Sequence, residues 1–304
     1  MLPQLSASQA AASPCESVEQ WWPRHRAIAL EHSDPIHQAI IGGFVADRVG
    51  WAFASGYQAA LRALFPDAPS DRICALCVTE ADGNSPKAIR SSLSKSGDQW
   101  TLSGSKRWTT LGPNGALFFV AARDEAASRE RASIKVVRVA SESPGLKIEA
   151  MPATEFVPEV PHAQLRLENL KVLETEILPG DGYDRYVKPF RTVEDIHVQA
   201  AVLAYLMREG QRLAWPRSWL ERLFALLAAL SRIADMPADE PETHVALSGA
   251  LAFGADLIGE TEAFWLAAAA DPAAPRWRRD RELLKVASDA REQRTRRAWE
   301  RIRA

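Results

Sequence analysis

Residues 77–112 hold two groups of hydroxyl side chains, each placed in a turn that contains glycine. The first group is Thr79 and Ser85, in the stretch Cys-Val-Thr-Glu-Ala-Asp-Gly-Asn-Ser. The second is Thr109 and Thr110, in the stretch Gly-Ser-Lys-Arg-Trp-Thr-Thr-Leu-Gly. Hydroxyls and backbone N–H groups in such turns can satisfy the oxygens of a diphosphate without a surrounding cage of cations. This stretch therefore predicts a binding surface for a phosphate-bearing ligand.

Trp108 stands directly before the second hydroxyl group and offers a flat apolar wall for a planar ring. The plainer interpretation is that Thr79, Ser85 and Thr110 only form turns and that Trp108 belongs to the core. Each residue taken alone favours that interpretation. The two turns taken together, at this spacing, favour the binding interpretation.

Three sections of the chain differ in hydrophobic period and predict three domains. Residues 1–70 are predicted to be helical, since Asp34 before Pro35 is typical of a helix start and apolar residues follow at helical spacing. Residues 71–182 change to short strands separated by Gly, Pro and Asp turns, which predicts a small antiparallel β-barrel or sandwich. Residues 183–304 return to helix.

The last section predicts four helices separated by short linkers that contain proline. The first is expected from Thr192 to Trp215, a second after Ser218, a third from Val245 to Ala269 and a fourth from Arg279 to Arg303. Such an arrangement is typical of an up-down bundle. The predicted fold class is therefore α+β with several domains: N-terminal helices, a central antiparallel β-barrel and a C-terminal four-helix bundle.

The two turns resemble the flavin-binding region in the middle domain of the acyl-CoA dehydrogenase family. Val-Thr-Glu followed by Gly-Asn-Ser resembles the turn in which a Val/Thr pair meets the edge of the flavin ring and a Ser meets its diphosphate. Gly-Ser-Lys-Arg-Trp-Thr-Thr resembles the second turn, whose Trp and Thr flank the ring. The resemblance covers about residues 74–204 and agrees with the predicted order of helices, strands and helices. It implies FAD as the cofactor, bound by Val78, Thr79, Ser85, Trp108, Thr109 and Thr110.

The resemblance also implies an activity, the oxidation of an acyl-CoA-type thioester between its α and β carbons. In the family a carboxylate in a dry cleft removes the α-proton, because desolvation raises its pKa enough for it to act as a base. Most members place this carboxylate in a loop after the last long helix, a position for which we find no counterpart up to Ala304. Some members carry it at the start of the first helix of the C-terminal domain, and an ungapped comparison puts Glu194 there. The plainer interpretation is that Glu194 is an acidic residue in the first turn of a helix capped by Thr192.

Several departures from the family pattern keep other functions open. Asp195 stands where the family usually has Arg, and the Arg-x-x-Phe-Gly and Gln-x-x-Gly-Gly elements that meet the partner subunit's FAD are not recognisable. These departures favour a non-catalytic binding or scaffold protein, or the partner subunit of a full-length dehydrogenase. A flavin-dependent oxidase or monooxygenase on the same fold is a third candidate. His197, three positions after Glu194, could share its helix face, but a lone helical histidine more often lies at the surface or is satisfied in the core.

The three cysteines, Cys15, Cys74 and Cys77, form the sparse, odd set that is typical of a reducing compartment. Cys74 and Cys77 lie in an apolar, strand-like run where positions i and i+3 face opposite sides. No second pair of cysteines completes a zinc site. We therefore expect two small buried hydrophobic residues and no metal site.

Overall charge and hydropathy limit the kinds of binding partner that we expect. Lys and Arg number 37 against 39 for Asp and Glu, a formal net charge of −2, so we expect no nucleic-acid partner. The longest apolar runs, such as Ala263–Ala270, are too short to span a bilayer, so we expect no membrane partner. We expect a cytoplasmic protein whose partners are an acyl-CoA-type substrate and a second subunit, in a homodimer or in a heteromer with a related chain.

Overall fold

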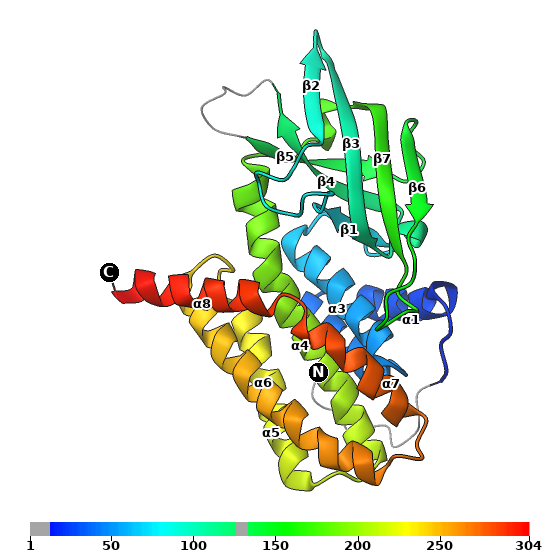
Figure 1. Ribbon diagram of the computed structural model, residues 1–304, viewed down its shortest axis with the longest axis vertical. Coiled ribbons are helices and arrows are strands. Elements are labelled where there is room, and N and C mark those ends of the chain that lie inside the picture. The colour runs from blue at the N-terminus through cyan, green and yellow to red at the C-terminus, as the bar shows by residue number, and fades with distance from the viewer. Residues whose placement is uncertain (1–12, 126–132, 304) are drawn as a thin grey trace. The chain divides into compact units, whose positions relative to one another are not determined.

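The structure is a computed structural model, and it describes residues 13–125 and 133–303 (Figure 1). Contacts divide the chain into a helical unit, which joins the two ends of the sequence, and a sheet unit. The helical unit comprises Met1–Ala63, Thr154–Glu159 and Thr192–Ala304, and the sheet unit comprises Leu64–Ala153 and Val160–Arg191. The three-domain division by hydrophobic period remains a prediction.

The helices form as the sequence leads us to expect near the N-terminus and differ from expectation near the C-terminus. Pro35 begins the second helix, and the Asp34 carboxylate accepts a hydrogen bond from the Ile36 N–H at 3.1 Å, which confirms the predicted start. The helices are α1 (Val18–Glu31), α2 (Pro35–Val45), α3 (Val49–Leu64), α4 (Lys188–Arg212), α5 (Arg217–Ala234), α6 (Pro241–Ala267), α7 (Ala273–Asp280) and α8 (Ser288–Arg303).

Two glycines let α2 and α3 approach α4 closely inside the helical unit. A Cβ atom added to Gly43 would lie 2.0 Å from the carbonyl oxygen of Ala201, and one added to Gly56 would lie 2.7 Å from the Cα of Val198. Both contacts are with backbone atoms, which cannot turn away as a flexible side chain can. The absence of a side chain at these two positions therefore sets how closely these helices pack.

We expect Gly43→Ala to lower the free energy of unfolding by about 1–3 kcal/mol, because the added methyl group forces the α2 and α4 backbones apart. Gly249→Ala is a matched control, since Gly249 also lies inside a helix but an added Cβ there meets nothing within 4 Å. That control should gain roughly 0.5–1 kcal/mol from the better helix propensity of alanine. Urea denaturation of both variants measures the difference, and an unchanged midpoint for Gly43→Ala contradicts the packing described.

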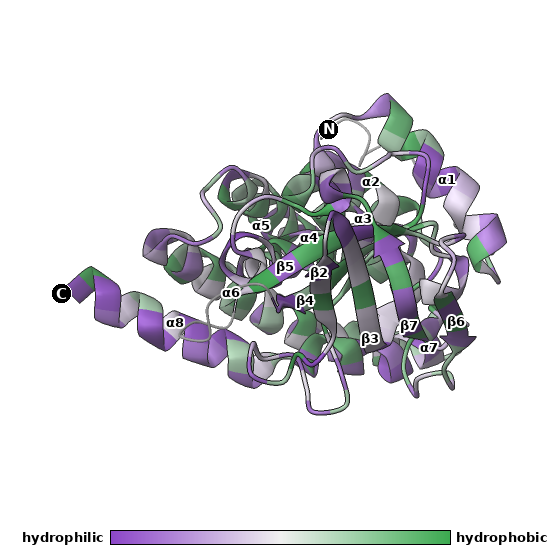
Figure 2. Ribbon diagram, turned by 90° about the horizontal axis from the view of Figure 1, so that it is seen from above, coloured by the Kyte–Doolittle hydropathy of each residue, from purple (hydrophilic) through white to green (hydrophobic). Residues whose placement is uncertain are grey.

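The predicted fourth C-terminal helix is not continuous. α7 ends at Asp280, a 3₁₀ turn covers Arg281–Lys285, and Ala287 has a φ of +69° before α8 begins. The Asp280 side chain is fully buried and accepts a hydrogen bond from the Val157 N–H at 2.8 Å, so a tertiary contact fixes the end of α7. This contact overrides the helical preference of the residues that follow. Figure 2 colours α8 mostly purple, in agreement with its many charged residues.

Within the described residues, the sheet unit contains seven strands that form one mixed sheet. Their order is β1-β4-β2-β3-β7-β6, with β5 paired to β4. In Figure 1 the long strands β3 and β7 lie next to each other, as their ladder of antiparallel pairs requires. The strands are β1 (Cys74–Cys77), β2 (Ser92–Ser96), β3 (Gln99–Thr110), β4 (Leu117–Asp124), β5 (Ile134–Ala140), β6 (Leu146–Ala150) and β7 (His162–Val172).

The prediction of a closed antiparallel barrel is wrong. β4 pairs in parallel with β1 and with the start of β2, while β5 pairs with it in antiparallel register. No ladder among the described residues joins β6 to β5, so the sheet stays open. Alternation of polar and apolar residues specifies which face of a strand is buried, but not which strand lies beside it. Cys74 and Cys77 are both buried in β1, which confirms that they are small core residues.

Candidate functional site

The two predicted turns lie side by side in the sheet unit. The carbonyl oxygen of Thr79 accepts a hydrogen bond from the backbone N–H of Arg107 at 2.8 Å. β1 leads directly into the first turn, and β3 carries the second near its end. Val78 and Thr79 therefore lie against the strand segment that continues into Trp108.

A buried ion pair joins the same two segments. Lys106 has no exposed surface, and its Nζ lies 2.5 Å from Oε1 of Glu80 and 3.4 Å from the carbonyl oxygen of Val78. Glu80 also accepts hydrogen bonds from the N–H groups of Arg90 and Ser91 at 2.7 and 3.0 Å. Burial lowers the pKa of Lys106, and Glu80 opposes part of that shift. Burial alone would raise the pKa of Glu80, but Lys106 and the two N–H groups outweigh it and lower that pKa.

Trp108 occupies an unusual backbone conformation at the second turn. β3 leaves its register with β7 between Lys106 and Thr109, and Trp108 has a φ of +57°. Its N–H donates to Sδ of Met151 at 3.3 Å, and its ring meets His162 edge-on with centroids 5.9 Å apart. The side chain is still 47% exposed. Left-handed backbone at a bulky residue is rare and concentrates at binding sites, where the surroundings hold it in place.

The hydroxyl groups of the two turns divide into two kinds. Thr79 and Thr110 are half-buried and Ser85 is exposed, so all three reach the surface of the sheet unit. Thr109 is only 1% exposed, and its hydroxyl lies 3.7 Å from Sγ of Cys77 in the interior. A contact between Thr109 and a ligand would therefore use its backbone.

The loop that carries Ser85 is held at several points. Glu80 and Gly83 exchange two backbone hydrogen bonds of 2.8 and 3.1 Å, and Gly83 has a φ of +112°, which favours glycine. The Arg123 guanidinium donates to the carbonyl oxygens of Lys87 and Ile89 at 3.2 and 2.6 Å. The turn is thus fixed before any ligand arrives.

Arg191 lies beside the first turn, a placement that the sequence did not reveal. It lies in the first part of α4 that belongs to the sheet unit, and its Nη2 donates to Oδ1 of Asn84 at 2.9 Å. The two residues are 107 positions apart, and no motif connects them. Only the folded chain shows that a cation lies beside the turn of Ser85.

Glu194 lies in the helical unit, in the second turn of α4. The predicted cap at Thr192 is wrong, because α4 begins at Lys188 and Thr192 is buried inside it. Glu194 is therefore not in the first turn of a helix, and stabilisation by the helix dipole does not account for it. Its side chain is half-buried.

The neighbours of Glu194 on α4 have their own partners. Asp195 accepts hydrogen bonds from Arg291 and Arg294 of α8 at 2.8 and 2.7 Å. His197 is 2% exposed, and its Nδ1 lies 2.7 Å from the carbonyl oxygen of Val193. Burial lowers the pKa of His197 to about 4. Of the two plain alternatives, surface or satisfied core, the structure shows the core for His197.

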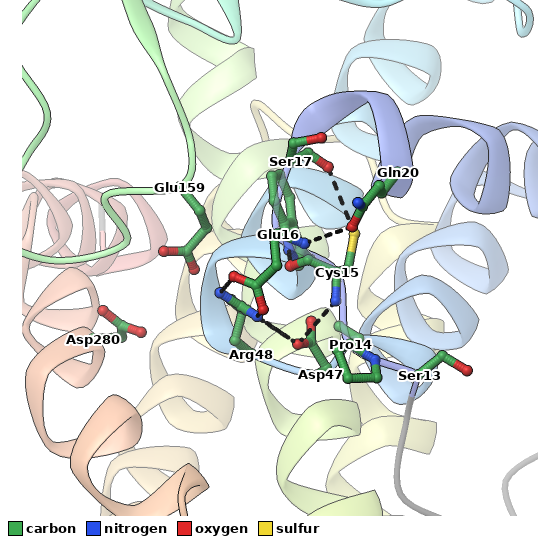
Figure 3. Close-up of polar contacts among 12 residues, drawn as sticks. Ser13, Pro14, Cys15, Glu16, Ser17, Gln20, Asp47, Arg48, Glu159 and Asp280 are labelled. Atoms are coloured by element: carbon green, nitrogen blue, oxygen red, sulfur yellow. Dashed lines mark hydrogen bonds and ion pairs between the residues drawn. The ribbon is translucent and has the colours of Figure 1, made fainter.

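A second charged cluster, in the helical unit, is structural in character (Figure 3). Arg48 Nη2 lies 2.7 Å from Oε1 of Glu16 and 2.8 Å from Oδ2 of Asp47. Glu159 is paired with Arg279 at 3.5 Å, which ties the 154–159 segment to the helices. Within residues 13–125 and 133–303, no group of three or more His, Cys, Asp or Glu side chains is arranged to hold a metal ion.

Several polar and aromatic side chains of the two turns reach the surface of the sheet unit. The hydroxyls of Thr79, Ser85 and Thr110 reach the surface, the Trp108 indole is exposed, and the Arg191 guanidinium contacts Asn84 beside Ser85. These groups give the sheet unit a polar and aromatic surface at the two turns.

Comparison with known proteins relates part of the chain to a known domain family. The sequence profile of the acyl-CoA dehydrogenase middle domain matches residues 75–170. The 3-sulfinopropanoyl-CoA desulfinase of Paraburkholderia xenovorans (strain LB400) is 30% identical over 99 residues, which are 32% of this chain and 25% of that protein. The match thus spans about a quarter of the relative's length.

Solved structures share the fold. Butyryl-CoA dehydrogenase from Megasphaera elsdenii aligns with a TM-score of 0.69 at 15% identity, over 87% of this chain and 81% of that one. The FAD complex of PigA aligns with a TM-score of 0.69 at 14% identity, over 94% and 90% of the two chains. At such identities the likeness shows the fold alone.

The chain matches the middle domain of the acyl-CoA dehydrogenase family over residues 75–170 and shares the fold of solved acyl-CoA dehydrogenases. With 304 residues it is shorter than typical members, and its identity to structural neighbours is low. Members of this family typically are flavoproteins that bind FAD. Among the described residues, no helix has both the length and the apolar character needed to cross a membrane.

Proposed function

We propose that the protein is an FAD-dependent, acyl-CoA dehydrogenase-like enzyme that oxidises an acyl-CoA-type thioester between its α and β carbons. The observation that carries the proposal is the hydrogen bond between Thr79 and Arg107, which joins the two hydroxyl-bearing turns. The buried ion pair of Lys106 and Glu80 supports it, because it joins the segments that carry the two turns. An acyl-CoA thioester and a second or related subunit are the proposed partners.

Each residue has a role in this proposal. Val78 and Thr79 would hold the edge of the flavin ring, Trp108 would cover it, and Thr110 would bond to it. Ser85 would donate to the diphosphate, because a hydroxyl makes strong hydrogen bonds to charged oxygens. Bound FAD supplies an acceptor for the β-hydrogen and its electron pair.

Glu194 is the proposed base, on the strength of the resemblance. Its carboxylate would take the α-proton, so that the thioester loses two hydrogens and gains a carbon–carbon double bond. The electron pair of the Cα–H bond becomes the new double bond, while the β-hydrogen leaves with its own pair. A carboxylate does this best when the surroundings exclude water.

We expect Glu194→Gln to slow anaerobic bleaching of the FAD-loaded protein by a panel of acyl-CoA thioesters by roughly 10²- to 10⁴-fold. An amide cannot accept the proton, while its size and its hydrogen-bonding shape are nearly unchanged. Glu221→Gln is a matched control on α5, where the Glu221 side chain is 63% exposed and paired with Arg217. Equal bleaching rates in the Glu194→Gln variant and the wild type contradict the assignment of the base.

A second candidate is a member of the family that binds ligands without catalysis, as a scaffold or as the partner subunit of a full-length dehydrogenase. The ion pairs of Asp195 with Arg291 and Arg294 favour it, because a residue next to the proposed base is engaged in packing α8. Bleaching separates the two candidates. A wild type that takes up FAD yet is not bleached by any thioester supports the non-catalytic function.

A further inference from the structure

The turn of Gly83, Asn84 and Ser85 carries a cation supplied by a distant part of the same chain. We propose that Arg191 recognises a diphosphate group at this turn and makes the site prefer ligands that bear one. This inference rests on the proposed function for the identity of its ligand. It assigns to Arg191 a binding role that neither the fold nor the two sequence motifs imply.

The first argument is rigidity. Ser85 and Asn84 stand on a loop whose start is closed by the two hydrogen bonds between Glu80 and Gly83. Its end is held by the Glu80 carboxylate, and the Arg123 guanidinium holds its middle. A turn fixed in this way loses little conformational freedom when it binds an anion, so its contacts contribute more fully to affinity.

The second argument is charge. Lys87 is exposed on the same loop, and Arg191 reaches the loop from α4. The nearby acidic side chains already have cationic partners: Glu80 is paired with Lys106, and Asp82 lies 3.8 Å from Arg90. The loop therefore presents a net positive charge at the position where Ser85 offers its hydroxyl.

The third argument is the chemistry of the guanidinium. Arginine has five N–H donors in a planar fork that matches two oxygens of a phosphate. The bond to Oδ1 of Asn84 uses one of these donors and sets the direction of the group. The remaining N–H donors can bond to a charged oxygen, and hydrogen bonds between two charged groups are short and strong.

Two ligands of the proposed reaction carry a diphosphate, namely FAD and the CoA part of the substrate. The experiment therefore compares FAD with riboflavin, and CoA with pantetheine, by isothermal titration calorimetry. Inorganic pyrophosphate is a fifth probe, with its effect on the midpoint temperature of unfolding as the readout. The variants are Arg191→Gln and Arg191→Lys, with Arg185→Gln as a matched control that removes one exposed charge from the same unit.

We expect Arg191→Gln to weaken FAD binding by roughly 10- to 100-fold and to leave riboflavin binding unchanged. Arg191→Lys should keep part of the affinity, because lysine retains the charge but not the fork. Arg185→Gln should behave as the wild type does. The same pattern found for CoA against pantetheine, instead of FAD against riboflavin, also supports the inference and assigns the diphosphate to CoA.

The inference can stand even where the proposed function fails. If the wild type binds neither flavin nor CoA, but pyrophosphate raises its midpoint temperature and Arg191→Gln abolishes that rise, diphosphate recognition holds without the enzyme. Three results overturn the inference. They are equal losses for FAD and riboflavin, an Arg191→Gln variant indistinguishable from Arg185→Gln, or no binding of any phosphate-bearing probe.

Discussion

Lys106→Met should lower the free energy of unfolding by about 3–5 kcal/mol, because it leaves the buried carboxylate of Glu80 without its counter-charge. The lysine side chain is fully buried and the glutamate is 7% exposed, so water cannot replace the lost partner. Methionine has nearly the same shape as the removed side chain, so the change is electrostatic rather than steric. Denaturant unfolding followed by circular dichroism measures it. A loss of this size is a large fraction of the stability of a typical domain.

An exposed pair on the same sheet provides the matched control. Lys147 and Glu168 lie 2.8 Å apart, with side chains 59% and 54% exposed. Lys147→Met should therefore cost no more than about 1 kcal/mol. If both lysine variants lose the same small amount, the Lys106–Glu80 pair does not fix the two turns. A double variant, Lys106→Met with Glu80→Gln, should recover part of the loss because no charge is then left buried.

The helical unit should lose stability in mild acid through two buried histidines. Burial lowers the pKa of His25 to about 3, helped by the charge of Arg62, and burial lowers the pKa of His197 to about 4. In the unfolded chain both rings have a pKa near 6.5. Below pH 6.5 the two histidines take up protons in the unfolded state but stay neutral in the folded state. The free energy of unfolding therefore falls as the pH falls. The loss continues down to the two folded pKa values.

The size of the effect follows from the linkage between proton binding and folding. Between pH 7 and pH 5 each histidine should remove about 2 kcal/mol, and the two together about 4 kcal/mol. His25→Phe should remove about half of this pH dependence, because phenylalanine keeps the ring stacked on Trp21 but takes up no proton. His37→Gln, at a ring that is 36% exposed, is the control. An unfolding free energy that is the same at pH 7 and pH 5 contradicts the burial of the two neutral rings.

The parts of the fold that the sequence predicts well are those set by local signals. The start of α2 follows from Asp34 and Pro35, because an N-cap side chain and a proline at the first position act within one turn. The two hydroxyl turns carry their own glycine and serine signals, so the sequence alone indicates both turns. Their contact through Thr79 and Arg107 does not follow from the strand order, because β4 and β2 lie between β1 and β3 in the sheet.

The parts that could not be predicted depend on distant contacts. No short-range sequence signal indicates that β4 pairs in parallel with β1. Nor does any indicate that Asp280 accepts a hydrogen bond from Val157 at the end of α7. The start of α4 at Lys188 was missed because the preceding residues wind as a π-helical turn rather than a cap. Arg191 was missed for the same kind of reason, since its partner Asn84 lies on a different element. The hydrophobic periodicity of a segment indicates which side chains are buried, whereas the strands and side chains that they contact depend on the whole fold.

The most direct test of the central claim is an equilibrium titration of the wild type and the Trp108→Ala variant with FAD, followed by flavin fluorescence. If the two turns form one flavin-holding surface, the wild type takes up FAD to saturation. Loss of the exposed indole should then weaken binding by about tenfold, with the circular dichroism spectrum unchanged. A wild type that leaves flavin fluorescence untouched, or a variant that binds FAD as tightly as the wild type, would contradict the account.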